Sequence, residues 1–166
     1  MFVGIIYHML EIVTLGEEVL RRRAEPVTVF DTALRLLVDD MFDSLSQERG
    51  VGLAAPQVGV SRRLFIVDIE GGEKAVFINP EILETSMEVG PYEEGCLSIP
   101  GVWHDVVRPL GVTVQAQDVT GKAFTVKAEG MFARVIQHEF DHLNGTLFID
   151  RLNDTDREKI LQAYEK

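Results

Sequence analysis

Apolar residues recur at helical spacing between Asp31 and Gln47. They occupy positions 34, 37, 38, 41, 42 and 45, which is the i, i+3, i+4, i+7, i+8, i+11 pattern of one helix face. Asp31 stands before this run as an N-cap, and Gly50 follows it as a stop. The pattern therefore predicts a long helix over residues 31–47.

The middle of the chain has the pattern of short strands separated by turns. Short segments rich in β-branched and aromatic residues are bounded by Gly-Gly, Asn-Pro and Thr-Gly-Lys turn signals, as strands usually are. The segment 119–122 reads as a hairpin turn between the last two of them. The predicted strands are 63–69, 75–78, 112–118 and 124–128.

Helical spacing returns near the C-terminus. Residues 131–144 predict a helix that Gly145 ends, and residues 156–164 predict a short final helix, because the stretch 155–158 (TDRE) has the spacing of a capping box. Strands do not alternate with crossover helices along the chain. The order therefore favours an α+β fold over a doubly wound parallel sheet.

Composition narrows the class of protein. The 166 residues are 46% hydrophobic and 26% charged, with a net charge of −11, which is typical of a globular chain with one core. The acidity argues against binding to nucleic acid, since no basic run exceeds Arg21-Arg22-Arg23. There is no internal repeat or linker. We therefore expect a single domain over residues 1–166.

The cysteine content and the N-terminus bear on location. The only cysteine is Cys96, so an intramolecular disulfide is excluded and a reducing compartment is favoured. The apolar opening MFVGIIY is too short to span a membrane and lacks the features of a signal peptide. We expect a cytoplasmic protein with no membrane partner.

The segment 135–145, VIQHEFDHLNG, contains candidate metal ligands. His138 and His142 lie one helical turn apart, so both imidazoles can reach one ion. Glu139 lies about 100° further round the helix, where it can reach a metal-bound water. The apolar neighbours indicate a central helix, in which these polar groups would be costly without a partner. The pattern alone also fits two histidines that lie on a helix surface and bind no metal.

Two imidazoles require a third protein ligand, and Cys96 is the candidate. It follows Gly95 in the segment 93–101 (EEGCLSIPG), which we interpret as a loop whose glycine permits a close backbone approach. A thiolate and two imidazoles leave a fourth position for water, as in open catalytic sites. The alternative is a small buried hydrophobic cysteine, which is the commoner case.

The segment 50–57, GVGLAAPQ, begins like a dinucleotide-binding fingerprint. That fingerprint must follow a strand and open a helix. Here it follows a predicted helix end, and Pro56 and Gly59 oppose a continuing helix. We interpret it as a glycine loop that holds backbone amides near a substrate, with Gln57 as its polar tip.

Together the segments 50–57, 94–98 and 137–145 resemble the three signature motifs of the peptide deformylase family, in order and in spacing. The resemblance runs from about Leu10 to the end of the chain. It implies mixed or antiparallel sheets around a central helix that carries the HExxH motif, with a long N-terminal helix. It also implies removal of the formyl group from N-formylmethionine at the N-terminus of nascent polypeptides, with release of formate.

The resemblance implies a role for each residue of the site. Cys96, His138 and His142 would bind one divalent metal, usually Fe²⁺ in the cell, with Zn²⁺, Ni²⁺ or Co²⁺ able to occupy the site. Glu139 would be the general acid and base. The oxyanion would be stabilised by the side chain of Gln57 and the N–H of Leu97. Substrate contacts would come from the backbone of Val51 and Gly52, as to an added strand, and from a methionine pocket at Met131 and Val135.

Supporting residues are less specific. We expect Glu94 and Arg108 to brace the cysteine loop as an ion pair. Asp141 could either orient a ligand imidazole or be a solvated helix charge. Trp103 and His104 receive no catalytic role.

The chain departs from the family at its ends. Residues 1–8 precede the usual family start, which resembles Met9 onward, and are either an extension or an upstream start. Gly16-Glu17-Glu18 stands where relatives often carry Gly-Asp-Pro, which should affect a turn and not the site. The chain ends 24 residues after His142, whereas some relatives dock on the ribosome with a longer basic helix. The expected partner is thus the nascent formylated polypeptide, with the ribosome a weak expectation.

Two alternatives remain at the level of sequence. A metalloendopeptidase with an HExxH site would take its third ligand downstream, where Asp150, Asp154 and Glu158 are the candidates. A catalytically silent metal-binding or ribosome-associated protein would have no chemical need of Glu139 and Gln57.

Overall fold

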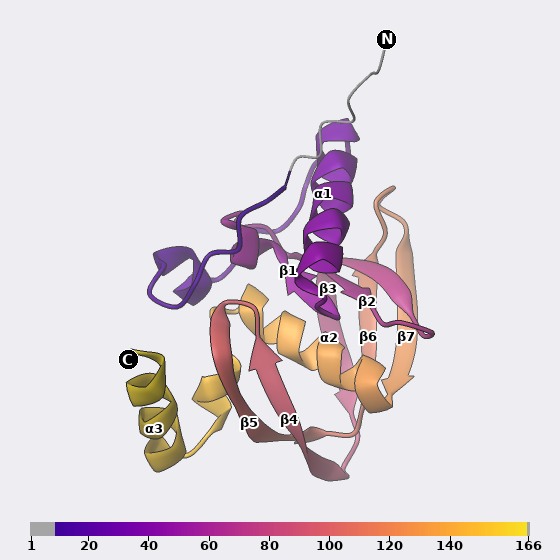
Figure 1. The fold of residues 1–166 in the computed structure, drawn as a ribbon. Coiled ribbons are helices and arrows are strands. Elements are labelled where there is room, and N and C mark those ends of the chain that lie inside the picture. The colour runs from indigo at the N-terminus through magenta and orange to yellow at the C-terminus, as the bar shows by residue number, and fades with distance from the viewer. Residues whose placement is uncertain (1–8, 166) are drawn as a thin grey trace.

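The computed structural model describes residues 9–165, so the predicted N-terminal extension at residues 1–8 lies outside the described residues. Helices and strands follow one another from the N-terminus to the C-terminus as drawn in Figure 1. They are η1 (Glu18–Arg21), α1 (Thr32–Glu48), β1 (Gly52–Ala54), η2 (Ala55–Val58), β2 (Leu64–Asp68), β3 (Lys74–Thr85), β4 (Val89–Cys96), β5 (Ile99–Pro109), β6 (Gly111–Gln117), β7 (Ala123–Glu129), α2 (Gly130–Leu143), η3 (Phe148–Arg151) and α3 (Asp154–Tyr164), where η marks a 3₁₀-helix.

The long N-terminal helix α1 forms where the apolar spacing predicts it. The carboxylate of Asp31 accepts a hydrogen bond from the N–H of Leu34 at 3.0 Å, which satisfies one of the unpaired donors of the first turn. The chain leaves the helix at Arg49, in the left-handed region with φ 55°, and Gly50 follows. Both predicted boundaries are therefore confirmed to within a residue.

A five-stranded antiparallel sheet has the strand order β1-β2-β3-β6-β7. Its second strand, β2, is apolar almost throughout because it is buried on both faces. Leu64 and Ile66 belong to the cluster packed on α1, whereas Phe65 and Val67 belong to the cluster packed on α2. Successive side chains of a strand point to opposite faces, so α1 and α2 cover opposite faces of this sheet.

Strand β3 continues well beyond its predicted end. The Asn-Pro pair at positions 79 and 80 was interpreted as a turn signal, and this was wrong. The strand continues through this pair with a β-bulge, seen as a register shift between Ile78 and Glu81. Asn79 has φ 50° and its side chain bonds both the N–H and the C=O of Val27 at 2.8 Å. These tertiary bonds let the chain continue as a bulged strand.

Strands β4 and β5 form a separate two-stranded antiparallel sheet. The interpretation of residues 93–101 as a loop was therefore wrong, because only residues 97 and 98 make the turn between the two strands. The two glycines and the proline of this stretch are turn-forming residues in most contexts. Here they lie in the strands of a hairpin, in which Gly95 lies opposite Trp103.

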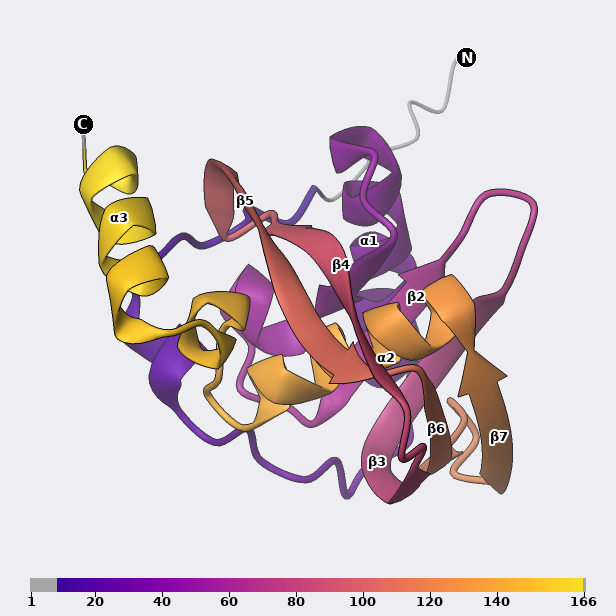
Figure 2. The same cartoon turned by 90° about the horizontal axis from the view of Figure 1, so that it is seen from below.

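Helix α2 lies between the hairpin and the larger sheet (Figures 1 and 2). Ala133, Ile136 and Leu143 belong to the core cluster that includes β2, β3 and β6. Arg134 and His138 instead bond residues of β4 and β5. The expected α+β fold, with antiparallel sheets around the helix that carries the histidines, is confirmed.

The last helix, α3, begins two residues earlier than predicted. Its N-cap is Asn153, whose side chain accepts a hydrogen bond from the N–H of Asp156 at 2.8 Å. The expected cap at Thr155 was wrong because Asn153 is an equally good capping residue placed two positions earlier. Among residues 9–165, no helix is long and apolar enough to cross a membrane.

Candidate metal centre and active site

Three candidate ligands converge from two elements. Cys96 ends β4, His138 and His142 lie on α2, and their ligand atoms all lie within 4.8 Å of one another. The Sγ of Cys96 is 3.4 Å from the Nε2 of His142. Thiolate and imidazole ligands bind an ion such as Zn²⁺ at about 2.0–2.3 Å, so ligand atoms this close can share one ion. The donor set therefore fits a divalent metal.

Glu94 orients the first histidine. Its Oε1 accepts a hydrogen bond from the Nδ1 of His138 at 2.8 Å, which leaves Nε2 free for a metal. We considered Asp141 for this role or as a solvated charge, and both interpretations were wrong. Asp141 is buried and instead bonds Arg108 and Arg151.

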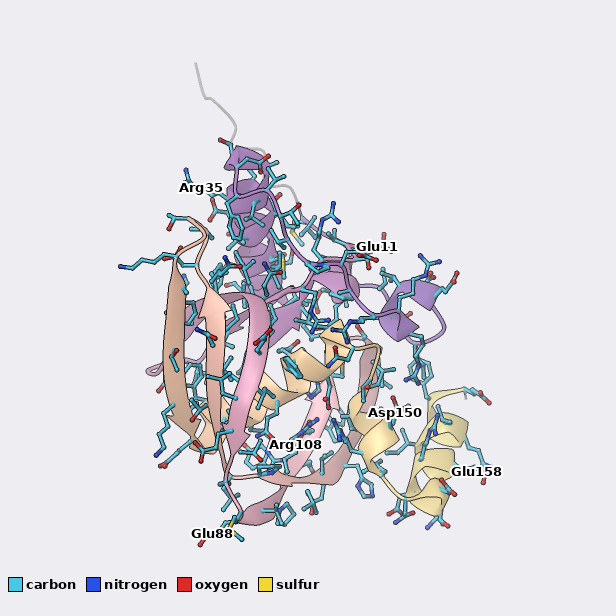
Figure 3. The ribbon with its side chains drawn as sticks, turned by 180° about the vertical axis from the view of Figure 1, so that it is seen from behind. Glu11, Arg35, Glu88, Arg108, Asp150 and Glu158 are labelled. Carbon is cyan, nitrogen blue, oxygen red and sulfur yellow. The ribbon has the colours of Figure 1, made fainter. Side chains whose placement is uncertain are left out.

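The predicted pair of Glu94 and Arg108 is confirmed, and it is buried. Arg108 donates from Nε at 2.7 Å and from Nη2 at 3.0 Å to the two carboxylate oxygens, and Arg134 adds a third bond at 3.0 Å. Burial alone would raise the pKa of Glu94, but the bonds from His138 and Arg108 lower it to about 2. Figure 3 shows Arg108 inside the fold, between α2 and the hairpin.

The pKa values of the two ligand imidazoles are shifted in opposite directions. Burial lowers the pKa of His142 well below its ordinary value, which favours the neutral ring that binds metal. Burial acts in the same direction on His138, but hydrogen bonds with Cys96 and Glu94 outweigh it and raise the pKa of His138.

Glu139 is held in a buried position against β1. A side chain at Gly52 would have its Cβ 2.8 Å from the Oε1 of Glu139 and 2.6 Å from the Cγ1 of Val135, so only glycine fits there. Within residues 9–165, the Oε2 of Glu139 has no hydrogen-bond partner. Burial raises the pKa of Glu139 to about 7. A carboxyl group with this pKa can both accept and donate a proton near neutral pH.

Gln57 is fixed with its amide nitrogen toward the cysteine. It lies in η2, so the glycine loop predicted for 50–57 is in fact the short strand β1 followed by one 3₁₀ turn. The N–H of Ala54 donates to Oε1 at 2.9 Å. The Nε2 then donates to the Sγ of Cys96 at 3.5 Å and to the Oγ of Ser98 at 3.3 Å. The side chain thus presents a donor at the candidate metal centre.

Strand β1 is an edge strand and leaves backbone groups for a ligand. The C=O of Val51 accepts a hydrogen bond from the N–H of Asp68 at 2.9 Å, and Gly52 lies opposite Val67. In an antiparallel pair the hydrogen-bonding side alternates with each residue. The N–H and C=O of Gly52 therefore point away from β2.

A cavity of about 530 Å³ opens onto these groups. It is lined by Gly52 of β1 and by Leu97 of the hairpin turn, so it lies beside an edge of each sheet. Met131, which is exposed, and Val135, which is buried, contribute part of its wall. Of the ten residues that we selected from the sequence, nine line this cavity. The tenth, His142, is buried and belongs to the ligand group with Cys96 and His138.

Sequence reasoning missed two aromatic residues of the cavity. Tyr92 and Trp103 both line it, and the indole of Trp103 lies across Gly95, where a Cβ would be 2.4 Å from its Nε1. Trp103 enters the cavity wall through the register of β5 on β4. Only a prediction that residues 93–101 belong to a paired hairpin would have placed Trp103 opposite Gly95 and so at the cavity.

The downstream acids do not join the metal ligands. Asp150 forms ion pairs with Arg21 and Arg157, and Glu158 lies on α3 at the outside of the molecule (Figure 3). In the part of the chain that the structure describes, the group able to hold a metal is Cys96 with the two histidines. The geometry thus favours the upstream cysteine over the ligand set of a metalloendopeptidase.

Comparisons with known proteins agree with this geometry. The family model for polypeptide deformylase matches residues 9–158. The peptide deformylase of Chromobacterium violaceum is 47% identical over 160 residues, which cover 95% of each chain. That of Treponema pallidum is 48% identical over 155 residues, covering 93% of this chain and 95% of the relative. The crystal structure of a Legionella pneumophila peptide deformylase has a TM-score of 0.90 at 46% identity, covering 95% of this chain and 94% of that one.

Proposed function

The chain belongs to the peptide deformylase family, and from this membership we propose which of its residues carry out the family's reaction. The protein is a metal-dependent hydrolase that removes the formyl group from N-formylmethionine at the N-terminus of nascent polypeptides and releases formate. The observation that carries the assignment of residues is the convergence of Cys96, His138 and His142 beside the buried Glu139 and Gln57.

Cys96, His138 and His142 would hold one divalent ion, for which we propose Fe²⁺ in the cell. When bound, the ion acidifies a water molecule and polarises the formyl oxygen as a Lewis acid. Glu94 keeps the ring of His138 in the orientation that ligation requires, through its 2.8 Å hydrogen bond with Nδ1. The thiolate of Cys96 makes the site sensitive to oxidation.

Glu139 is the proton carrier. Its carboxylate accepts the proton of the water that attacks the formyl carbon, and it returns this proton to the methionine nitrogen as the C–N bond breaks. A pKa of about 7 suits both steps. Glu139 lies against Gly52 at the wall of the cavity, so its carboxyl group would lie beside a chain bound at the edge of β1.

Gln57 and Leu97 stabilise the negative charge that develops on the formyl oxygen. The Nε2 of Gln57 is the first donor and the backbone N–H of Leu97 is the second. A single donor of this kind contributes about 3–4 kcal/mol to stabilisation of the transition state. Because the N–H of Ala54 fixes the orientation of the Gln57 amide, this donor needs no reorganisation during the reaction.

The substrate backbone adds as a strand to the edge of β1. Gly52 offers both of its backbone groups. The C=O of Val51 already serves Asp68, and the same alternation directs its N–H toward β2, so Val51 would flank the bound chain at the cavity wall. Met131 and Val135 would contact the methionine side chain at the cavity wall. We further propose a single-domain cytoplasmic enzyme whose partners are the nascent formylated polypeptide and the ribosome.

Formate release from formyl-Met-Ala-Ser by anaerobically prepared, iron-loaded protein tests the function. Glu139→Ala should keep the metal and lose turnover, because it removes the proton carrier and leaves the three ligands intact. Metal content and kcat are measured on the same samples. Failure of the iron-loaded wild type to release formate would refute the activity, and a variant that kept most of its turnover would refute the role of Glu139.

A further inference from the structure

An extended N-terminal segment, residues 10–15, crosses the elements that carry the site. We call it the strap. It begins beside α1, where the N–H of Leu10 donates to the Oγ of Ser44 at 3.1 Å, and it ends at the turn before η1. In Figure 1 the strap is the dark indigo chain that passes beside α1. It belongs to neither sheet, yet its backbone bonds reach two separate parts of the active site.

Two donors of the strap reach two different site elements. The N–H of Val13 donates to the C=O of Gln57 at 2.8 Å, and the N–H of Leu15 donates to the C=O of Ser98 at 2.8 Å. Residues two apart in an extended chain present their N–H groups on the same side. The strap therefore contacts η2 and the hairpin turn with one face of its backbone.

These two acceptors adjoin the proposed oxyanion donors. Gln57 supplies one donor from its side chain, and Ser98 directly follows Leu97, whose N–H is the other. The two elements also touch through the 3.3 Å bond from the Nε2 of Gln57 to the Oγ of Ser98. The strap thus closes a ring of hydrogen bonds that runs through both.

Side-chain packing anchors the strap at both ends. Leu10 and Ile12 pack against the core cluster of α1 and β2, whereas Leu15 packs against a different cluster that includes Ile99 and Phe148, with Cys96 beside it. Anchored in two clusters, the strap can transmit the position of one element to the other, since packed interiors are stiff.

We propose that the strap is a positioning device that sets the distance between the two oxyanion donors, through Val13 on Gln57 and Leu15 on Ser98. The inference rests on the proposed roles of Gln57 and Leu97. It predicts that losing a strap bond impairs the chemical step and spares metal binding, because Cys96, His138 and His142 are not its hydrogen-bond partners.

Val13→Pro removes the donor to Gln57, since proline has no N–H. We expect kcat to fall about 10- to 100-fold, as small displacements of catalytic groups do, with KM within about twofold and metal content unchanged. In a Gln57→Ala background the same substitution should change kcat less than about twofold, because residues that act through one another are not additive.

Thr14→Pro is the matched control. Thr14 is the exposed neighbour of Val13, and among residues 9–165 its N–H has no backbone acceptor, while its C=O, which proline keeps, accepts from Glu17. Its kinetics should stay those of the wild type. If Val13→Pro does not fold, replacing Val13 by its α-hydroxy acid deletes the same donor without constraining φ, and Thr14 treated alike serves as its control.

The possible outcomes distinguish failure of the strap inference from failure of the oxyanion role of Gln57. A Val13 variant that loses kcat and metal in proportion, or whose effect adds fully to that of Gln57→Ala, overturns the strap and leaves the oxyanion role in place. A Gln57→Ala variant with unchanged kcat overturns the oxyanion role, and the strap inference falls with it.

Discussion

Glu94 lies among three buried side chains, those of His138, Arg108 and Arg134, that bond its carboxylate. One oxygen accepts from the Nδ1 of the ligand His138, and the carboxylate also binds Arg108 and Arg134. All of these side chains are buried. Without the carboxylate, Arg134 would lose its carboxylate partner and Arg108 would keep only Asp141. The contribution of Glu94 therefore concerns both the metal and the fold.

Glu94→Gln should weaken metal binding about 10- to 100-fold, as loss of a partner of a ligand histidine does. It should also lower the free energy of unfolding by about 3–5 kcal/mol, because Arg134 loses its buried counter-ion and Arg108 loses one of two. Competition with a chelator measures the first effect and urea unfolding the second. Glu93→Gln, at the exposed neighbouring position, should change neither, and equal behaviour of the two variants would contradict the role of Glu94.

Cys96→Ala should release the metal, with a larger loss of affinity than the about 10- to 100-fold that indirect changes cause, since it removes a direct ligand. Asp150→Ala and Glu158→Ala should retain the metal, because these acids lie outside the ligand group of residues 9–165. Metal content after dialysis checks all three. Retention by Cys96→Ala together with loss in a downstream variant would support the ligand set of an endopeptidase.

At the scale of elements, the turn between β6 and β7 was the most predictable part of the sheet. Residues 119–122 form the predicted hairpin turn, and the Oδ1 of Asp118 accepts bonds from the N–H and Oγ1 of Thr120 and from the N–H of Lys122. An Asp side chain that bonds the backbone two residues on is a local device. These bonds join residues within four positions of one another, so the turn can be predicted without knowledge of the rest of the fold.

Asp118→Ala should lower the free energy of unfolding at neutral pH and leave turnover unchanged. The bond from the Thr120 side chain, then that from its backbone, lowers the pKa of Asp118 below its ordinary value. The stabilisation is thus present above the unfolded pKa of about 3.9 and is lost as the pH falls through the lower folded pKa. The difference in stability between wild type and variant should therefore shrink in acid. Denaturant unfolding at several pH values measures this, and a constant difference would argue against the ionised turn.

The hairpin of β4 and β5 was the least predictable element. Its sequence contains Gly90, Pro91, Gly95 and Gly101, residues that weaken strand propensity. What forms the strands is the pairing of Val89–Gly95 with Trp103–Pro109 and the buried ion pairs that join the hairpin to α2. Neither is a property of a local window of sequence.

At the scale of the whole molecule, the cavity is made by parts of the chain that are far apart in sequence. The C-terminal end of α1, strand β1, the hairpin and α2 all contribute to its wall. Its only tryptophan, Trp103, is 62% exposed there. The residue therefore reports on the occupancy of the cavity.

Saturating Met-Ala-Ser should shift the fluorescence emission of Trp103 to shorter wavelength, because a bound peptide displaces water from the indole. The shift should follow the binding isotherm from calorimetry. A Trp103→Phe variant, which has no other tryptophan, supplies the background. Binding without any spectral change would show that the peptide does not pass over this part of the cavity.

The sequence by itself determined the features that depend on local spacing. These are the helix over 31–47, the strands 63–69, 112–118 and 124–128, and the pairing of His138 with His142 on one helix face. The need for a third ligand pointed to Cys96, the only cysteine, and the motif resemblance gave Gln57 its role at the oxyanion. No local period links either residue to the histidines. Helical and strand periods act within a few residues, so a single sequence reveals them directly.

Only the tertiary structure decided which side chains surround the ligands. Glu94 rather than Asp141 orients His138, Trp103 enters the cavity wall, and the backbone of residues 10–15 reaches Gln57 and Ser98. Each depends on strand register or on a hydrogen bond between residues distant in the chain. A shift of one residue in register turns a side chain to the opposite face, and that choice is made by the packing of the whole fold.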